Sequence, residues 1–249
     1  MDMDKEICWL VTNNCNLKCQ FCHSFSGYTE MNLPEIKSFV SKIKSLGEQK
    51  ITLSGGEAFL HNHINEIVEL LFDSGFIITI VTNGVSLGHF NPSNYLKVHE
   101  IVYSIDSIDD EINIKIGRGH SHVKMLTSNL EIARQINPLL SIRVNTVVNS
   151  VTLNAIDNVG ETITNLNINK WRLFEFAPLR GLAKSNRDFF SISKYDFFSI
   201  VKKMQSKYPN INIQVRAEQD YESNYLLILP NGVFVKTING HDVIVNYSF

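Results

Sequence analysis

The sequence predicts an α/β fold, namely an open, partial (β/α)6 barrel of the TIM type that carries a C-terminal extension. Strand-like and helix-like segments alternate from the start of the chain to about residue 178, and this alternation favours a parallel sheet with helical crossovers. Six such repeats are too few to close an eight-stranded barrel. With 249 residues, the chain is expected to form one domain over 1–249, with the barrel core at 1–180 and the extension at 181–249.

The individual elements follow from apolar spacing and from the turn residues between them. The expected strands, which are apolar and rich in β-branched residues, are 7–11, 50–54, 76–82, 100–106, 139–148 and 170–178. The expected helices, in which apolar residues recur at helical spacing, are 33–46, 64–72, 123–136, 153–166 and 193–206. In the tail, Asn231-Gly232 and Asn239-Gly240 are typical of β-hairpin turns, so short strands are expected there.

The charge and hydropathy of the chain exclude several classes of function. A net charge of −2 provides no basic field, so neither nucleic acid nor a membrane surface is expected as a partner. No apolar run approaches the ~20 residues of a membrane helix. The acidic start, residues 1–4, does not resemble a signal peptide. We therefore expect a cytoplasmic protein.

Three of the four cysteines lie close together in a CxxxCxxC spacing, as Cys15, Cys19 and Cys22, directly after the first expected strand. In a reducing compartment such a group indicates metal or redox chemistry rather than disulfides. Three thiolates can hold three corners of a [4Fe-4S] cluster and leave the fourth iron free to bind another molecule. A structural zinc site is the alternative, but His23 is badly placed as a fourth ligand and Cys8 is the only other thiol.

Polar residues collect where the expected strands end. The cysteines follow the first strand, Gly55-Gly56-Glu57 follows the second, Asn83 the third, and Asp106 ends the fourth. In parallel α/β folds the carboxyl ends of the strands meet at one edge of the sheet, where the chemistry takes place. We therefore expect the active site at this edge. The histidines at 23, 61, 63, 120 and 122 do not form a metal-binding set and are expected in loops or at the surface.

The CxxxCxxC spacing followed by Gly-Gly-Glu at the next strand end resembles the radical S-adenosylmethionine (SAM) superfamily. The resemblance implies that Cys15, Cys19 and Cys22 hold a [4Fe-4S] cluster whose free iron binds the methionine part of SAM. It also implies a set of residues around SAM. These are Ser54, Gly55, Gly56, Glu57, Asn83, Ser104 and Arg118. The glycines would let the backbone approach the ligand closely.

Longer segments resemble one family within this superfamily, the viperins, which are antiviral nucleotide dehydratases. The run Ser104–Gly119, which ends in Ile-Gly-Arg-Gly, carries the most specific likeness. Further similar segments, at 50–57, 144–149, 170–174 and 225–229, extend the likeness from about residue 8 to 235.

The viperin resemblance implies a reaction. A 5′-deoxyadenosyl radical from SAM takes the C4′ hydrogen of a ribonucleoside triphosphate. Loss of the 3′-hydroxyl as water, followed by one electron and one proton, gives a 3′-deoxy-3′,4′-didehydro nucleotide that terminates viral RNA chains. The electrons imply a flavodoxin- or ferredoxin-type donor as a partner.

A triphosphate carries about four negative charges and needs several charge-assisted donors. The residues that the resemblance assigns to the substrate are Lys50, Arg118, Arg143, Asn145, Lys170, Arg172 and Tyr225. Alternation puts Lys170 and Arg172 on one face of their strand and Trp171 on the other. That face is expected to look into the barrel, where positive charge without an anion is costly. Tyr225 is expected to close over the substrate and is the candidate catalytic residue.

The chain departs from the viperin pattern in two places. Cys8 and Leu10 replace polar residues near the base or ribose, so CTP, UTP and GTP all stay open as substrates. Residues 178–182 replace a more acidic segment near the adenine of SAM. Alternative functions are another radical SAM activity, such as deazapurine synthesis or peptide modification, and a zinc-stabilised binding module.

Overall fold

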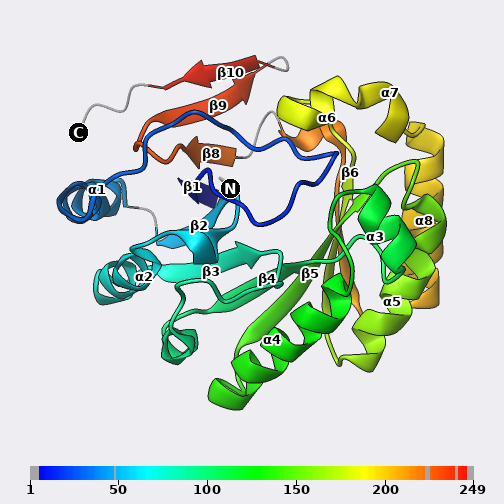
Figure 1. Ribbon diagram of the computed structural model, residues 1–249, viewed down its shortest axis with the longest axis horizontal. Helices are drawn as coiled ribbons and strands as arrows, with labels where there is room; N and C mark the ends of the chain where they lie inside the picture. The colour runs from blue at the N-terminus through cyan, green and yellow to red at the C-terminus, as the bar shows by residue number, and fades with distance from the viewer. Residues whose placement is uncertain (1–5, 48, 222–224, 239–240, 246–249) are drawn as a thin grey trace.

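A single ten-stranded sheet runs through the computed structural model, in the order β10-β9-β8-β1-β2-β3-β4-β5-β6-β7 (Figure 1). The structure describes residues 6–47, 49–221, 225–238 and 241–245, with the backbone alone for Glu6 and Tyr225. The strands are β1 (Glu6–Thr12), β2 (Lys50–Gly55), β3 (Ile77–Thr82), β4 (Glu100–Ser104), β5 (Ser141–Val148), β6 (Lys170–Glu175), β7 (Asn212–Arg216), β8 (Tyr225–Ile228), β9 (Phe234–Ile238) and β10 (His241–Ile244). Every pair from β8 through β1 to β7 is parallel, and β9 and β10 are antiparallel additions at one edge.

The sheet stays open, with β7 at one edge and β10 at the other, which confirms the partial barrel. The expected extension supplies both edges. Strand β7 lies beside β6, whereas β8, β9 and β10 lie on the far side of β1 (Figure 1). The C-terminal third of the chain therefore frames the core on two sides. The division at residue 180 stays a prediction.

Helices cover the outer face of the sheet (Figure 1). They are α1 (Leu33–Ser45), α2 (Ile64–Asp73), α3 (Asp110–Lys115), α4 (His122–Ile136), α5 (Ile156–Asn165), α6 (Gly181–Ser185), α7 (Arg187–Phe190) and α8 (Lys194–Lys207), with short 3₁₀ turns at Ala58–Leu60, Pro92–Leu96, Leu153–Ala155 and Glu218–Tyr221. None of the described helices combines the length and apolar character needed to cross a bilayer.

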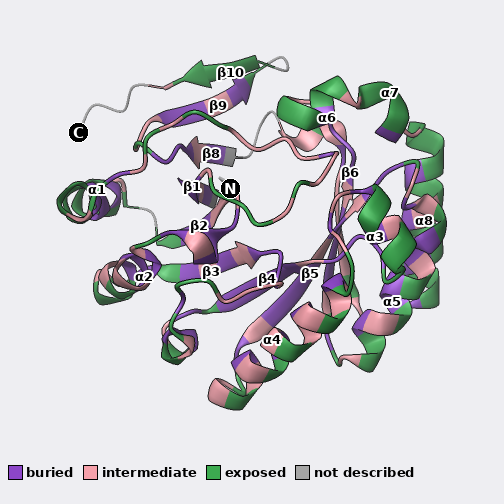
Figure 2. Ribbon diagram, in the orientation of Figure 1, coloured by how far each residue is buried: buried purple, intermediate pink, exposed green. Residues whose placement is uncertain are grey.

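Strand alternation decides which residues enter the core. In β1 the buried residues Ile7, Trp9 and Val11 join the main apolar core, whereas Cys8 and Leu10 face the other way. In β6 Trp171 is fully buried against the helices and donates to Thr146 Oγ1 at 2.9 Å. Figure 2 shows this division as buried strands beneath helices with exposed outer surfaces. The inward face is thus set by residue parity.

All six expected strands and all five expected helices are present, with ends that shift by a few residues. The antiparallel pairing of β8 with β9 confirms the hairpin at Asn231-Gly232, whereas Asn239-Gly240 lies outside the described residues. Four elements of the structure were not predicted, namely α3, α6, α7 and β7. Each is only four to six residues long, too short for a periodic pattern to appear.

Candidate active site

The cysteine loop, residues 13–32, crosses the carboxyl ends of the parallel strands (Figure 1). At its start, the N–H groups of Gly56 and Glu57 donate to the carbonyls of Thr12 and Asn14, both at 2.8 Å. The turn after β2 and the beginning of the loop therefore form one hydrogen-bonded unit. This brings the Gly-Gly-Glu turn directly beside the first cysteine, as the sequence predicted.

Two glycines make this close packing possible. A Cβ added at Gly56 would lie 2.3 Å from the carbonyl oxygen of Asn14, and one at Gly117 would lie 2.1 Å from that of Lys18. Both distances are far inside van der Waals contact, so only glycine fits at either position. The expected reason for the Gly-Gly pair was the close approach of a ligand. The structure adds a different reason, because the chain's own cysteine loop occupies that space.

The three cysteines form no disulfide, and they lie close enough for the charge of one thiolate to raise the pKa of another. Cys15 is exposed and receives the N–H of Leu17 at 3.4 Å, whereas Cys19 and Cys22 are partly buried. Burial raises the pKa of Cys19 to about 11, although the Arg118 guanidinium opposes the shift. The thiols thus share one loop beside a fixed cation.

Within the described ranges, no three Cys, His, Asp or Glu side chains gather closely enough to hold one metal ion. A [4Fe-4S] cluster takes each cysteine on a different iron, so three cysteines of one loop beside a guanidinium are a donor set that fits it.

The Glu57 carboxylate is buried and joins three groups of the neighbouring strand end and turn. It accepts hydrogen bonds from Thr82 Oγ1 at 2.7 Å, from the Asn83 N–H at 2.7 Å and from the Phe59 N–H at 3.2 Å. Burial raises the pKa of Glu57 to about 7 against these three hydrogen bonds, which favour the charged form. Glu57 therefore ties the turn after β2 to the end of β3 and also caps the 3₁₀ turn at Ala58–Leu60.

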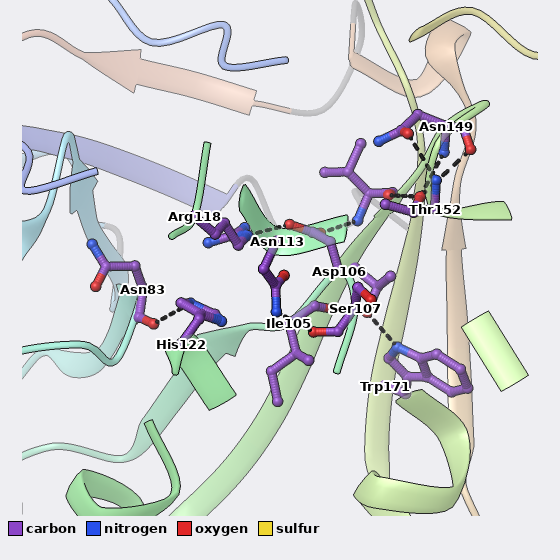
Figure 3. Close-up of polar contacts among 12 residues, drawn as sticks. Asn83, Ile105, Asp106, Ser107, Asn113, Arg118, His122, Asn149, Thr152 and Trp171 are labelled. Atoms are coloured by element: carbon purple, nitrogen blue, oxygen red, sulfur yellow. Dashed lines mark hydrogen bonds and ion pairs between the residues drawn. The ribbon is translucent and has the colours of Figure 1, made fainter. Parts of the chain in front are cut away.

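Asn83 connects the end of β3 to the cysteine loop. Its Nδ2 donates to Asn16 Oδ1 at 2.8 Å and lies 3.9 Å from the Cys15 sulfur. Its carbonyl oxygen lies 3.1 Å from Nε2 of His122 (Figure 3). Three expected site residues, Cys15, Glu57 and Asn83, thus meet at one point of the sheet edge.

The expectation that the histidines lie in loops or at the surface is wrong for His122, which is buried in the first turn of α4, whereas His61 is buried but lies in the loop after the 3₁₀ turn at Ala58–Leu60. Burial and the nearby Arg118 lower the pKa of His122 to about 3, so its ring is neutral. Helical spacing could have revealed this, because His122 begins the buried face that continues with Leu126 and Leu130.

Arg118 forms a buried ion pair with Asp106 in which its Nε donates to Oδ2 (Figure 3). Asp106 also accepts the Val147 N–H at 2.8 Å, and the Arg118 guanidinium lies 5.8 Å from the ring centre of Phe21 in the cysteine loop. The charge of Arg118 acts on Cys19 and on Glu57. Arg118 therefore belongs to the cysteine side of the site.

This placement separates Arg118 from the other basic residues that the sequence grouped together. Arg143 and Lys170 both bind Glu100, with Arg143 Nη2 and Lys170 Nζ each 3.0 Å from a carboxylate oxygen. Arg172 donates from Nε and Nη2 to Gln214 Oε1 at 2.9 and 2.7 Å. Lys50 is exposed at the amino end of β2. The five basic residues expected around the triphosphate are therefore divided. Arg118 lies at the cysteine loop, and the other four lie along the inward face.

Glu100 is the anion that the sequence analysis missed. It is buried at the start of β4 and also accepts the Ser141 hydroxyl at 3.0 Å. Burial alone would raise the pKa of Glu100, but Arg143 and Lys170 outweigh it and hold the pKa below its usual value. Alternation could have placed Glu100 on the inward face, but its pairing depends on strand order, which no local pattern gives.

Two buried polar atoms on the inward face of β5 make no hydrogen bond in the part of the chain that the structure describes. They are Arg143 Nε and Asn145 Oδ1. Buried polar groups nearly always have partners, so such atoms mark a place where a polar ligand fits. Asn145 stands opposite Ser104 in register, which puts a second expected site residue beside it.

Three further expectations concern residues on or near the inward face. Ser54, Cys8 and Leu10 lie together, since Cys8 pairs with Thr52 and Leu10 with Ser54. The side chain of Tyr225 lies outside what the structure describes, so its closing role stays a prediction. In the segment 178–182, Arg180 turns to the C-terminal hairpin and binds Asp242.

Comparison with protein families gives one match, in which the profile of the radical SAM superfamily covers residues 9–158. Among curated proteins, the chain is 27% identical to an S-adenosylmethionine-dependent nucleotide dehydratase of Fibrobacter sp. (strain UWH6) over 94% of this chain and 77% of that protein. The enzyme of the same name from Lacinutrix mariniflava is 29% identical over 94% of this chain, which spans half of that protein. S-adenosylmethionine-dependent nucleotide dehydratase RSAD2 of Danio rerio is 31% identical over 68% of this chain and 49% of that protein.

Solved structures with the same fold are more distant in sequence. Streptococcus suis SuiB bound to the precursor peptide SuiA superposes with a TM-score of 0.74 at 14% identity, over 94% of this chain and 59% of that one. The protein anSMEcpe with bound AdoMet and a peptide superposes with a TM-score of 0.70 at 16% identity, over 95% of this chain and 74% of that one. At this identity the likeness concerns the fold alone.

Proposed function

The chain belongs to the radical SAM superfamily, and from this membership we propose that it is a nucleotide dehydratase acting on a ribonucleoside triphosphate. The product would be the 3′-deoxy-3′,4′-didehydro nucleotide, an RNA chain terminator suited to antiviral defence. CTP, UTP and GTP are the candidate substrates. The similarity to several nucleotide dehydratases over most of the chain supports this reaction class.

Cys15, Cys19 and Cys22 would hold the [4Fe-4S] cluster, and the strand ends around Ser54–Glu57, Asn83 and Ser104 would hold SAM. When bound, cluster and SAM supply the 5′-deoxyadenosyl radical that removes the C4′ hydrogen. Gly56 and Gly117 hold the cysteine loop against the sheet, as the distances above require. Arg118 keeps a fixed positive charge beside that loop, and the buried carboxyl group of Glu57 lies at its start.

The inward face of β5 and β6 carries the observation on which the substrate proposal rests. Arg143, Lys170 and Arg172 lie there, and two of them bind the carboxylate of Glu100. With the unsatisfied Nε–H of Arg143, this surface has donors and net positive charge for a polyphosphate, whereas the unsatisfied Oδ1 of Asn145 can accept a hydroxyl group of the ribose. The substrate's charged end would lie against β5 and β6.

The base would lie toward β1 and β2. Beyond Lys50 at the amino end of β2, the inward side chains there include Cys8, Leu10 and Ser54, which are small or apolar and uncharged. Tyr225 would close over the bound nucleotide and is the proposed catalytic residue. We also propose a cytoplasmic setting with a flavodoxin- or ferredoxin-type electron donor.

The test is turnover by protein reconstituted anaerobically with iron, sulfide and dithionite. One of the four ribonucleoside triphosphates is expected to raise 5′-deoxyadenosine formation at least tenfold, with a product lighter than the substrate by one water in mass spectrometry. If no triphosphate raises it, the substrate proposal is wrong.

A matched pair of variants tests the residues. Arg143→Gln is expected to lower triphosphate-dependent turnover at least tenfold, because it removes a charged donor from the inward face. Arg134→Gln changes the same residue type on α4, where the side chain donates to the Asn167 carbonyl, and is expected to leave turnover within twofold of wild type. Equal losses in both variants would show that the effect is not local to the proposed site.

A further inference from the structure

An exposed surface that combines apolar and basic side chains lies directly behind the cysteine loop. Its apolar members are Ile114, Leu182 and Phe189, whose side chains are 45, 44 and 52% exposed. Its basic members, all exposed, are Lys18, Lys115, Lys184 and Arg187. We refer to these seven residues as the cluster-side patch.

Backbone contacts fix the patch to the cysteine loop. The N–H of Gln20 donates to the Ile116 carbonyl at 2.9 Å, and Asn186 Nδ2 donates to the Gln20 carbonyl at 2.8 Å. The Ala183 N–H donates to the carbonyl of Cys22 at 3.0 Å. The last turn of α3 and the pair α6–α7 are therefore both bonded to the segment that carries the thiols.

Only one layer of side chains separates the patch from a cysteine. A small apolar core, made by Phe21, Ile116, Phe176, Ala183 and Phe190, packs against Cys19. Phe190 is in edge contact with Phe21 at 5.8 Å, and its neighbour Phe189 is exposed above it. Lys115 Nζ lies 5.4 Å from the Phe189 ring centre, so α3 and α7 meet at the surface. A single layer of packed side chains therefore lies between the patch and the cysteine loop.

The charge of the patch differs from that of the molecule. The chain has a net charge of −2, whereas the patch carries four basic residues, with Asp188 the acidic residue between Arg187 and Phe189. Of the acidic residues in the first turn of α3, Glu111 lies one helical turn before Ile114 and Lys115, so Glu111 and Asp188 border the patch and its four basic residues leave it net positive. Within the described ranges none of the four basic side chains forms an ion pair.

We propose that the cluster-side patch is the docking surface for a small acidic electron-carrier protein. This rests on the proposed function, since that reaction consumes electrons delivered to the cysteine loop. Electron transfer weakens steeply with distance, so a donor must dock close to the thiols, and one layer of side chains lies between the patch and Cys19. Weak redox complexes use small interfaces with complementary charge around an apolar centre, which is the composition of this patch.

The test is binding and electron transfer with a flavodoxin as the probe. In the double variant Lys115→Glu/Arg187→Glu, affinity for oxidised flavodoxin at low salt is expected to fall at least tenfold. The reduction of the reconstituted protein by flavodoxin hydroquinone, followed by stopped-flow absorbance, is expected to slow by a similar factor. Dithionite-driven turnover is expected to stay within twofold of wild type, because dithionite needs no docking.

Helix α8 offers a matched control, since it also displays exposed Tyr195 and Phe198 beside Lys202 and Lys203. Lys202→Glu/Lys203→Glu makes the same change in net charge away from the cysteine loop, and is expected to alter flavodoxin affinity less than twofold. Equal weakening by both double variants, or unchanged affinity in the patch variant, would overturn the docking proposal. Failure of the dehydratase proposal would instead appear as missing triphosphate-dependent turnover with dithionite, whatever the binding result.

Discussion

At the scale of single residues, the buried pair Asp106–Arg118 places a fixed positive charge beside the thiols. Asp106 is fully buried and Arg118 is 6% exposed. Breaking such a pair leaves an uncompensated buried charge, which costs about 3–5 kcal/mol. Asp106→Asn is therefore expected to lower the free energy of unfolding of the apoprotein by about this amount, measured by urea denaturation.

The control for this prediction is an exposed ion pair. Lys97 Nζ lies 3.0 Å from Glu69 Oε1, with side chains that are 32 and 50% exposed. Glu69→Gln is expected to cost less than about 1 kcal/mol. Similar losses in the two variants would contradict a special role for the buried pair.

A second residue-scale prediction concerns the pH dependence of stability. The folded-state pKa of Glu57 is about 7 and its ordinary value is 4.5. Because the folded value is the higher one, the stabilisation by protonated Glu57 is complete below pH 4.5 and is lost as the pH rises through 7. Relative to Glu57→Gln, the wild-type apoprotein is expected to lose about 3 kcal/mol between pH 4.5 and 8, at 1.4 kcal/mol per pKa unit.

Urea denaturation at several pH values measures this difference. Glu66→Gln is the control, since the pKa of Glu66 is lowered, chiefly by a backbone hydrogen bond. Its stabilisation is lost only at acid pH, so the difference between wild type and Glu66→Gln is expected to be flat above pH 4.5. A flat difference for Glu57→Gln as well would show that Glu57 is not perturbed by burial.

At the scale of elements, the cysteine loop depends on the turn after α3. Gly117 and Gly119 share a left-handed backbone, with φ of 85° and 79°, but only Gly117 touches the loop. Alanine at either position is expected to cost about 1–2 kcal/mol through backbone strain. Gly117→Ala alone is expected to displace the loop, because its Cβ would lie 2.1 Å from the Lys18 carbonyl oxygen.

Iron and sulfide content after anaerobic reconstitution distinguishes the two glycine variants. Gly119→Ala, whose added Cβ meets open space, is expected to bind as much iron as wild type. Gly117→Ala is expected to bind less than half as much. Equal iron content would mean that the loop tolerates the displacement.

Ion pairs around Glu100 connect three strands, since Glu100 on β4 binds Arg143 on β5 and Lys170 on β6. Glu100→Gln leaves Arg143 and Lys170 without their carboxylate, so a bound triphosphate would supply the missing negative charge. A nucleoside triphosphate is therefore expected to raise the melting temperature of Glu100→Gln more than that of wild type. Ser141→Ala removes a neutral partner of Glu100 and is expected to shift like wild type. An equal shift in Glu100→Gln would mean that no triphosphate binds near this network.

At the scale of the whole molecule, the sequence predicted those parts that depend on local pattern. Apolar alternation placed β1 to β6, and residue parity placed Trp171 on the helix side and Lys170 on the other. The positions of β7 beside β6 and of β8 beside β1 depend on pairing between distant segments, which local pattern does not record. The same limit hid Glu100, 70 residues away from the Lys170 that it binds.

Arg180 joins distant parts of this open sheet in a way that only the assembled fold reveals. It follows β6, yet its Nε donates to Asp242 Oδ2 on β10 at 2.7 Å, and its Nη2 donates to Thr237 on β9 at 3.1 Å. Its Nη1 lies 3.3 Å from the His23 carbonyl, and the guanidinium lies 4.2 Å from the ring centre of Phe25. Figure 1 shows α6 reaching toward β9 and β10 across the cysteine loop. Arg180 therefore holds the loop after β6, the cysteine loop and the C-terminal hairpin in one arrangement.

Asp242→Asn removes the charge that receives this arginine and is expected to loosen all three segments together. A charge-assisted pair of this kind contributes about 1.5–3 kcal/mol, so amide exchange in residues 241–245 and 178–190 is expected to become at least tenfold faster. Hydrogen–deuterium exchange with mass spectrometry measures this, with Glu69→Gln as the variant that leaves both segments unchanged. If exchange accelerates in β10 alone, the hairpin frays without releasing the loop. Joint acceleration would show that Arg180 couples the loop after β6 to the C-terminal hairpin.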